Sequence, residues 1–326
     1  MNGGRVSCAG LESRSRSVRI LVSGSTGLVG SAVIDSLSHQ GHDLTRLVRP
    51  TTEVRKPRAT HSQELPQVLW NPQSGLLNSR ADGSEAIIHL AGASIAGHRW
   101  TAAWKRELGD SRVAATRQLI ASLRRLNRPP QIFIAASAIG FYGDRGDEEL
   151  TESSAPGTDF LSRLTVDWEA ESARAAEFGA RVVVLRFGVI LAKDGGALPR
   201  MALPFRLGAG GRLGSGRQWI SWVALEDIVG IIRFALETNL LSGPANAVSP
   251  NPVRNAEFTK ALGRVLHRPT IFPAPSFALR MALGEMADSL LLAGQKVYPI
   301  KLQRLGYHFL YPDLEPALAH VLRRPD

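Results

Sequence analysis

Strand-like and helix-like patterns alternate along most of the chain. Short apolar, β-branched runs predict strands, and apolar residues at three- and four-residue spacing predict the helices between them. Because strands alternate with helices, the pattern favours an α/β fold with a doubly wound parallel sheet and crossover helices. The predicted strands are 20–22, 43–48, 67–70, 86–90, 132–136 and 182–187, and the predicted helices are 28–37, 104–126, 161–178 and 225–237.

The pattern loosens beyond residue 191. A glycine-rich segment follows, and the last 60 residues hold two or three helical patterns separated by prolines. We therefore expect a short disordered arm, a nucleotide-binding sheet domain with a loop on its substrate side, and a smaller, mostly helical C-terminal domain. The expected bounds are 1–17 for the arm, 18–240 for the sheet domain, 195–222 for its loop and 241–326 for the C-terminal domain.

Glycines at positions 24, 27 and 30 lie between the first predicted strand and the first predicted helix. This arrangement of strand, tight turn and helix N-terminus presents free backbone N–H groups to a pyrophosphate. Gly24 would allow the turn, Gly27 would let a phosphate approach, and Gly30 would let the helix pack closely. The turn therefore indicates a Rossmann-type dinucleotide site. We assign cofactor contacts to Gly24, Ser25, Thr26, Gly27, Leu28, Val29, Gly30, Asn71, Leu90, Ala91, Gly92 and Ser137.

The end of the second strand distinguishes NADP from NAD, because an acid there binds the ribose 2′-hydroxyl and arginines bind a 2′-phosphate. Arg46 lies within this strand and Arg49 follows it, with Arg55, Lys56 and Arg58 soon after. The nearby acids are Asp43, which comes too early, and Glu53 in the loop. Bidentate arginine contact with phosphate favours NADP over NAD. The alternative is a solvated basic loop.

Composition narrows the partners. The formal net charge is +10, but the basic residues are scattered without a nucleic-acid-binding module, so we expect a small-molecule substrate and no nucleic acid. No apolar run is long enough to span a membrane, and we expect no membrane partner. The single cysteine, Cys8, fits a reducing compartment. Residues 1–17 share a composition with organellar transit peptides, but the arm is brief, and we expect a cytoplasmic protein. We assign no metal ligands, and consider a homodimer.

Three segments resemble the extended short-chain dehydrogenase/epimerase superfamily. They are the glycine turn 24–30, the strand ending in His89-Leu90-Ala91-Gly92, and residues 136–143. Further segments look like one atypical branch, a YfcH-like epimerase family that carries a C-terminal domain of the DUF1731 type. These segments are Ser111-Arg112, Trp168-Glu169, Arg186-Phe187-Gly188, 210–222 and Gly284-Glu285-Met286. The resemblance covers residues 18–322 and implies an epimerase or oxidoreductase fold with NAD(P) bound.

The superfamily also implies a Ser/Tyr/Lys catalytic set, in which the tyrosine transfers a proton and the lysine lowers its pKa. The predicted helix that should carry Tyr-x-x-x-Lys contains neither residue, and Leu161 and Thr165 take their places. Neither side chain transfers a proton usefully at neutral pH. The usual argument for ketone reduction is therefore lost, as it is in this branch generally.

Three catalytic candidates remain. Ser137 follows the strand that should point at the nicotinamide, so its hydroxyl could hold a substrate carbonyl or only cap the strand end. Tyr142 is the nearest phenol and could replace the missing acid, although a packing role is more common. Arg112 resembles the arginine that this branch uses where others have a catalytic asparagine. It could orient an anionic substrate or the cofactor, or pair with Glu107 or Asp110.

The segment 208–222 resembles the loop that epimerases lay over a nucleotide sugar, where an arginine grips the diphosphate. Alignment on Glu226-Asp227 places Ile220 at that position, which argues against a UDP-sugar unless Arg212 or Arg217 substitutes. We expect Trp219 and Trp222 nearby to pack between domains, and His89 to be a buried structural residue.

Two functions therefore compete. The first is an NADP-dependent oxidoreductase or epimerase with an unknown small-molecule substrate, and the glycine-rich loop favours it. The second is an NADP-binding sensor or scaffold with little catalysis, and the missing Tyr-x-x-x-Lys pair favours that.

Overall fold

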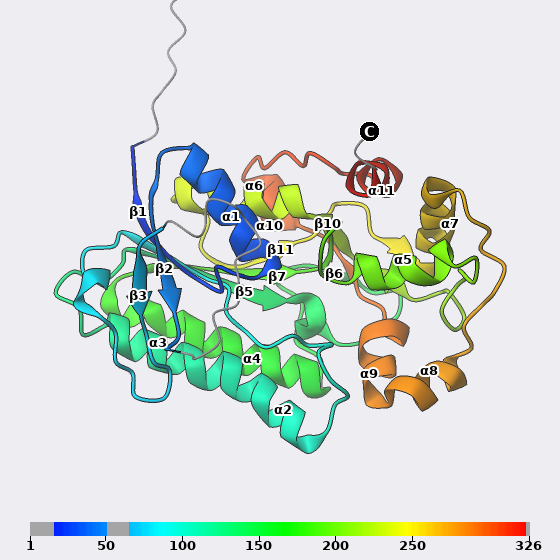
Figure 1. Ribbon diagram of the computed structural model, residues 1–326, viewed down its shortest axis with the longest axis horizontal. Helices are drawn as coiled ribbons and strands as arrows, with labels where there is room; N and C mark the ends of the chain where they lie inside the picture. Colours follow the sequence, from blue (N-terminus) through cyan, green and yellow to red (C-terminus); the bar gives the residue numbers. More distant parts are fainter. Residues whose placement is uncertain (1–15, 51–64, 324–326) are drawn as a thin grey trace, which may run out of the picture.

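The computed structural model describes residues 16–50 and 65–323. Seven parallel strands form the central sheet, in the order β11-β7-β5-β4-β1-β2-β3 (Figure 1). They are β1 (Arg19–Ser23), β2 (Asp43–Val48), β3 (Gln67–Leu69), β4 (Ala86–His89), β5 (Ile132–Ala138), β7 (Arg181–Phe187) and β11 (Gly243–Ala247). The strand order reverses between β1 and β4, and doubly wound sheets bind ligands at the carboxyl ends of the strands that flank such a switch. The prediction of a doubly wound parallel sheet is confirmed.

Helices cover both faces of the sheet because its central strands are apolar on both sides. Alternate residues such as Ile20 and Ile88 join one core with the helices above the sheet in Figure 1, whereas Leu21 and Ile87 join a second core with the helices below it. The first layer holds α1 (Leu28–His39), α6 (Leu225–Glu237) and α10 (Ile300–Arg304), and the second holds α3 (Ala115–Leu123) and α4 (Phe160–Ala173).

The predicted helix 104–126 is interrupted. Helix α2 (Ala102–Gly109) leads into a single π-helical turn, η3 (Asp110–Ala114), and α3 continues from there. A π-turn contains one residue more than an α-helical turn and often marks a functional site. Helix α4 likewise begins one residue earlier than predicted, with Asp159 as its N-cap, and ends in the 3₁₀ turn η5 (Arg174–Phe178).

The sheet domain extends past residue 240, the predicted boundary, because β11 pairs with β7 along its whole length. Leu302 and Tyr307 from the C-terminal region also pack in the first core. A third core surrounds Trp222, which is fully buried. It joins α7 (Asn255–Leu266) and α11 (Leu314–Leu322) to α5 (Leu198–Arg206), a helix that lies inside the expected loop 195–222.

The remaining elements are short. Helices α8 (Ser276–Leu283) and α9 (Glu285–Ala287) lie below α7 in Figure 1, and the π-turn η6 (Asp288–Leu292) follows α9 in the chain. The other turns and short strands are η2 (Ser79–Ala81), η4 (Ile139–Tyr142), β6 (Glu149–Leu150), β8 (Val189–Leu191), β9 (Trp219–Ile220), β10 (Trp222–Ala224), β12 (Val253–Arg254) and β13 (Lys296–Val297). Within the two described ranges, every helix is too short or too polar to cross a bilayer.

Candidate nucleotide site

The turn between β1 and α1 requires two of its three glycines. Gly24 has a φ of +69°, and a Cβ there would lie 2.7 Å from the carbonyl group of Leu90 at the end of β4. A Cβ on Gly30 would lie 2.2 Å from the Gly24 carbonyl oxygen. Side chains at these positions would therefore push the turn away from β4 and lift the helix from the strand. The expected roles of Gly24 in the turn and Gly30 in close packing match this geometry.

The N-terminus of α1 is open. Gly27 is its N-cap, is exposed, and places no side chain over the first turn of the helix. The first N–H groups of an α-helix have no intrahelical acceptor, and the helix dipole makes this end positive. Thr26, Leu28 and Val29 around it are only partly buried. The backbone at this turn thus fits a pyrophosphate, and a side chain at position 27 would narrow the approach.

Two arginines at the end of β2 differ in position. Arg49 is exposed just beyond the strand, and because Leu47 of β2 is the register partner of Ser23 of β1, this end of β2 lies beside the start of the glycine turn. Arg46 alternates with Leu47 and faces the α1 side, where it is buried and its Nε has no partner. Burial lowers the pKa of Arg46. The structure therefore leaves Arg49 as the accessible cation, whereas Arg55, Lys56 and Arg58 lie outside the described residues.

His89 connects the turn to the helices below the sheet. Its Nδ1 lies 2.7 Å from Ser23 Oγ, and its Nε2 lies 3.0 Å from Thr116 Oγ1. Trp168 Nε1 donates to the same Thr116 hydroxyl at 3.1 Å. Burial, and secondarily the charge of Arg49, lower the pKa of His89 to about 4, so the ring is neutral at pH 7. His89 is fully buried within this network.

Arg112 projects from the π-turn to the end of β4. A Cβ on Gly92 would lie 3.3 Å from its guanidinium carbon, and its Nη2 donates to the Ala93 carbonyl at 2.8 Å. The guanidinium also lies over the Trp168 ring, 5.3 Å from the centroid. Burial lowers its pKa to about 10, so it stays charged at pH 7. The ion pairs among the described residues do not include Arg112, so the sequence alternative of a pair with Glu107 or Asp110 is not seen.

A row of polar residues crosses the other half of the sheet. Ser137 on β5, Arg186 on β7 and Asn246 on β11 are register partners. Each of the three is almost fully buried. Ser137 lies within β5, which extends two residues further than predicted. The row therefore brings together three chain segments that are distant in sequence.

Glu169 on α4 organises this row. Ser137 Oγ donates to Glu169 Oε1 at 2.6 Å, and Arg186 donates to both carboxylate oxygens, at 2.8 and 2.7 Å. Burial by itself lowers the pKa of Arg186, but the hydrogen bonds and charge of the Glu169 carboxylate have a larger effect, so the pKa of the arginine is raised. Because an ionised carboxylate only accepts hydrogen bonds, the hydroxyl proton of Ser137 is directed at Glu169. Ser137 therefore presents lone pairs, and no proton, to any further partner.

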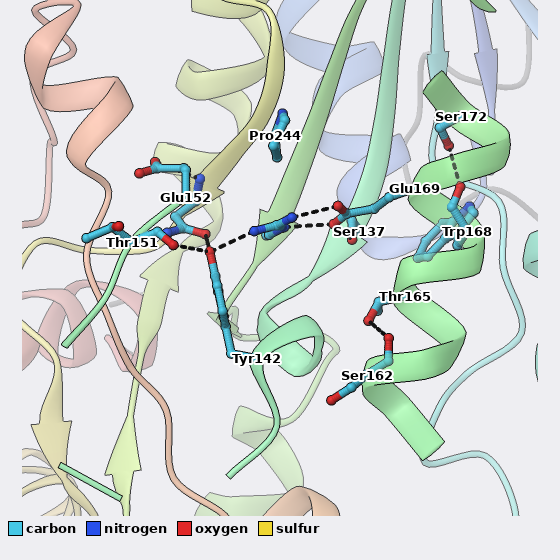
Figure 2. Close-up of polar contacts among 12 residues, drawn as sticks. Ser137, Tyr142, Thr151, Glu152, Ser162, Thr165, Trp168, Glu169, Ser172 and Pro244 are labelled. Carbon is cyan, nitrogen blue, oxygen red and sulfur yellow. Dashed lines mark hydrogen bonds and ion pairs between the residues drawn. The ribbon is translucent and has the colours of Figure 1, made fainter. Parts of the chain in front are cut away.

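Tyr142 lies at the far end of the same network (Figure 2). Its hydroxyl accepts from Arg186 Nη1 at 2.9 Å and lies 2.7 Å from Asn246 Oδ1 and 2.9 Å from the Thr151 carbonyl. The side chain has no exposed surface, and burial raises the phenol pKa. This arrangement gives Tyr142 a packing and hydrogen-bonding role within the core.

The places of the missing Tyr-x-x-x-Lys pair are both buried on α4. Leu161 packs against Gly140, where a Cβ would lie 3.4 Å from the leucine Cβ. Thr165 Oγ1 donates back to the carbonyls of Leu161 and Ser162, at 2.8 and 2.9 Å. Figure 2 shows the Thr165 hydroxyl turned toward its own helix. The ionisable side chain that follows these two positions on the same face of α4 is Glu169, one turn after Thr165.

The other residues predicted from the sequence to contact the cofactor or the substrate lie outside this polar network. Asn71 Oδ1 accepts from Gln73 N at 2.8 Å and fixes the turn after β3; its cofactor contact stays a prediction. Arg212 and Arg217 are exposed, and Ile220 pairs with Val253 in β9 and β12. Trp219 Nε1 donates to Asp147, and the cationic groups of Arg254 and Lys296 lie 4.1 and 4.9 Å from the centroid of its ring.

Sequence reasoning missed the role of Glu169 and Arg186, although both residues carried a signal. Arg186 is a charge inside the most apolar predicted strand, and a buried charge requires a partner. Glu169 lies four residues after Thr165, on the same face of the helix. Within the described ranges, no group of three His, Cys, Asp or Glu side chains is placed to hold a metal ion.

Comparison with known proteins identifies the relatives of this arrangement. The model of the NAD dependent epimerase/dehydratase family matches residues 20–247, and that of DUF1731, a domain of unknown function, matches residues 274–321. The chain is 43% identical over 307 residues to the epimerase family protein MT2273 of Mycobacterium tuberculosis, covering 94% of this chain and 98% of that one. It is 39% identical to the epimerase family protein YfhF of Bacillus subtilis, covering 94% and 98%.

Solved structures give the same result. The crystal structure of human epimerase family protein SDR39U1 with NADPH aligns with a TM-score of 0.83 at 33% identity, covering 93% of this chain and 99% of that chain. The enzyme WbmG of Bordetella bronchiseptica, solved with NAD, aligns with a TM-score of 0.75 at 16% identity, covering 96% and 95%. The second likeness concerns the fold alone.

Proposed function

Because the chain belongs to the NAD-dependent epimerase/dehydratase family, we propose that it binds NADP(H) in preference to NAD(H) and acts on a small hydroxyl-bearing molecule. The observation that supports the cofactor choice is Arg49, which is exposed at the end of β2, the strand whose last residues pair with β1 just before the open turn. A guanidinium there would bind a 2′-phosphate in bidentate fashion. The NADPH bound to the similar human protein is consistent with this choice.

The turn 24–30 would hold the pyrophosphate through backbone N–H groups. Leu90, Ala91 and Gly92 at the end of β4 would line the next part of the cofactor. Arg46 and Asn71 stay predicted contacts. When bound, the cofactor supplies hydride transfer, and the residues of this chain supply binding, orientation and proton handling.

Ser137 is proposed to contact the substrate as a hydrogen-bond acceptor. Its proton points to Glu169, so the sequence-based role of holding a carbonyl gives way to accepting from a substrate hydroxyl. A proton leaving that hydroxyl could pass to Ser137 Oγ while the serine proton passes to Glu169. Arg112 would orient an anionic group of the same substrate, since no acid of the described residues pairs with it. Tyr142 has no part in this proposed proton path, because its hydroxyl is bonded to Arg186, Asn246 and the Thr151 carbonyl.

The cofactor proposal is tested by titrating NADPH and NADH against the wild type, Arg49→Ala and the control Arg125→Ala. Arg125 is an exposed arginine that follows α3 at the opposite edge of the sheet. Losing a charged phosphate contact should weaken NADPH binding about tenfold, while NADH affinity changes less than about twofold. An equal loss for both cofactors would contradict the assignment of the 2′-phosphate to Arg49.

A second candidate is an NADP-binding sensor or scaffold with little catalysis. It is favoured by the polar network, in which the hydroxyls of Ser137 and Tyr142 are already engaged. Incubation with NADP⁺ and a fractionated metabolite extract separates the two candidates. NADPH formation followed at 340 nm, or conversion of a metabolite without net NADPH formation, supports the enzyme if it is lost in Ser137→Ala. Retained NADPH binding without turnover of any fraction supports the sensor.

A further inference from the structure

Helix α8 and the segment before it expose an unusual amount of apolar surface. None of the residues of α8 is buried, and Phe277 and Met281, one turn apart, are 66% and 76% exposed. Ile271 and Phe272 just before the helix are 69% and 57% exposed. A monomeric protein seldom leaves a contiguous apolar group of this kind in water without a partner.

A second chain segment extends the same surface. Phe272 N donates to the Gly210 carbonyl at 3.2 Å, and Gly214 N donates to the Ala274 carbonyl at 2.8 Å. These bonds lay the segment that follows α5 beside the segment before α8. Leu203 in α5 and Leu207 directly after it are 54% and 75% exposed. Figure 1 shows α5, α7 and α8 together at one end of the long axis. We call this region the α8 surface.

The charge of the two segments has one sign. Residues 195–225 and 258–284 contain eight lysines and arginines and no aspartate or glutamate. Arg264 and Arg280 pair with acids from neighbouring segments. Among the described residues, the ion pairs leave out Lys260, Arg206, Arg212 and Arg268, all of which are exposed. The α8 surface therefore combines exposed apolar side chains with free positive charge.

A basic hollow lies beside the apolar residues. Its volume is about 460 Å³, and it is lined by the end of α7 and the segment that follows, including Lys260, Arg264, His267 and Arg268. Ile271 follows its last lining residue, Thr270. An open, shallow hollow of this charge suits an anionic headgroup, and the exposed Ile271 and Phe272 directly follow its lining residues in the chain.

We propose that the α8 surface binds the surface of an anionic lipid bilayer, with the apolar side chains inserted at the interface and the cations on the headgroups. The observation favours lipid over a polyanion such as nucleic acid, because phosphate contacts do not require exposed isoleucine, phenylalanine and methionine. This surface contact is distinct from a membrane span, and it departs from the expectation that the protein has no membrane partner.

Sedimentation of the full chain with vesicles tests the proposal. Vesicles of phosphatidylcholine with phosphatidylglycerol should bind the protein at low ionic strength, whereas phosphatidylcholine alone should bind it much less. Phe277→Ser should lower binding about tenfold through lost apolar contact. Arg268→Glu should lower vesicle binding about fivefold. Adding 0.5 M NaCl should also lower the binding of the wild type, because salt screens the attraction between its cations and the headgroups.

The control positions lie at the amino ends of the sheet strands, away from the α8 surface. Leu240 precedes β11 and is 80% exposed, and Arg125 follows α3, so Leu240→Ser and Arg125→Glu make the same chemical changes away from the α8 surface. Unchanged NADPH affinity in all four variants shows that they fold. The proposal is overturned if anionic vesicles do not bind, or if the controls reduce binding as much as the test variants. Binding of an oligonucleotide but not of vesicles, lost in Arg268→Glu, would also overturn it.

Discussion

At the end of β1, the turn 24–30 leaves backbone N–H groups at the start of α1 free for a ligand. At the ends of β5, β7 and β11, the polar groups of Ser137, Arg186 and Tyr142 are instead bonded to one another and to Glu169. The first region has donors without a side-chain cap, and our proposal places a phosphate on them. The second is complete without a ligand, so it holds its geometry but offers few free groups for chemistry.

The largest expected effect comes from breaking the complete region. Arg186→Met would leave the Glu169 side chain, which is only 12% exposed, without its ion-pair partner, and removing one member of a largely buried ion pair costs about 3 kcal/mol of unfolding free energy. Urea denaturation measures this. Glu169→Leu combined with Arg186→Met should recover most of the loss. As a control, Arg264→Ala, which breaks the exposed pair with Glu315, should cost about 1 kcal/mol or less.

His89 lies between the two regions. The second-largest expected effect is a loss of stability when acid protonates this histidine. Its pKa is lowered in the folded protein, so its contribution to stability is present above the unfolded pKa of 6.5 and is lost as the pH falls toward about 4. This shift corresponds to about 3 kcal/mol. Unfolding free energies measured from pH 7 to pH 4 should fall less steeply in His89→Gln than in the wild type. Parallel pH profiles would rule out this linkage.

The open region should be sensitive to added atoms. In Gly30→Ala, a Cβ 2.2 Å from the Gly24 carbonyl oxygen forces the turn to move. NADPH binding, measured by calorimetry, should weaken on the order of 100-fold because the phosphate cradle is distorted. Gly109→Ala in α2 meets no atom within 4 Å and should leave binding unchanged while gaining up to about 1 kcal/mol of stability. Equal binding by both variants would contradict the role of the turn.

The smallest effect tests whether Tyr142 belongs to the complete region. Tyr142→Phe removes a hydroxyl that bonds Arg186 and Asn246, and should cost about 1–2 kcal/mol of stability. NADPH affinity should not change. A variant of full stability that loses turnover would instead place the phenol in the reaction.

The strand, turn and helix of the open region can be predicted from the sequence because their geometry is local. A strand, three glycines and a helix lie within residues 19–39, and Arg49 follows ten residues later. The complete region depends on long-range register instead. Strand pairing makes Ser137, Arg186 and Asn246 register partners, and no local sequence pattern encodes that pairing. For the same reason, no local pattern places β11 in the sheet domain, or predicts the helix α5 inside the glycine-rich segment.

The π-turn 110–114 makes the position of Arg112 depend on chain length as well as on residue type. Deleting one residue there would restore a continuous α-helix and rotate α2 by about 100° relative to α3. The arginine could be retained in such a chain and still face away from Gly92. Across divergent relatives, a one-residue gap at this position would therefore mark the loss of the site more reliably than a substitution.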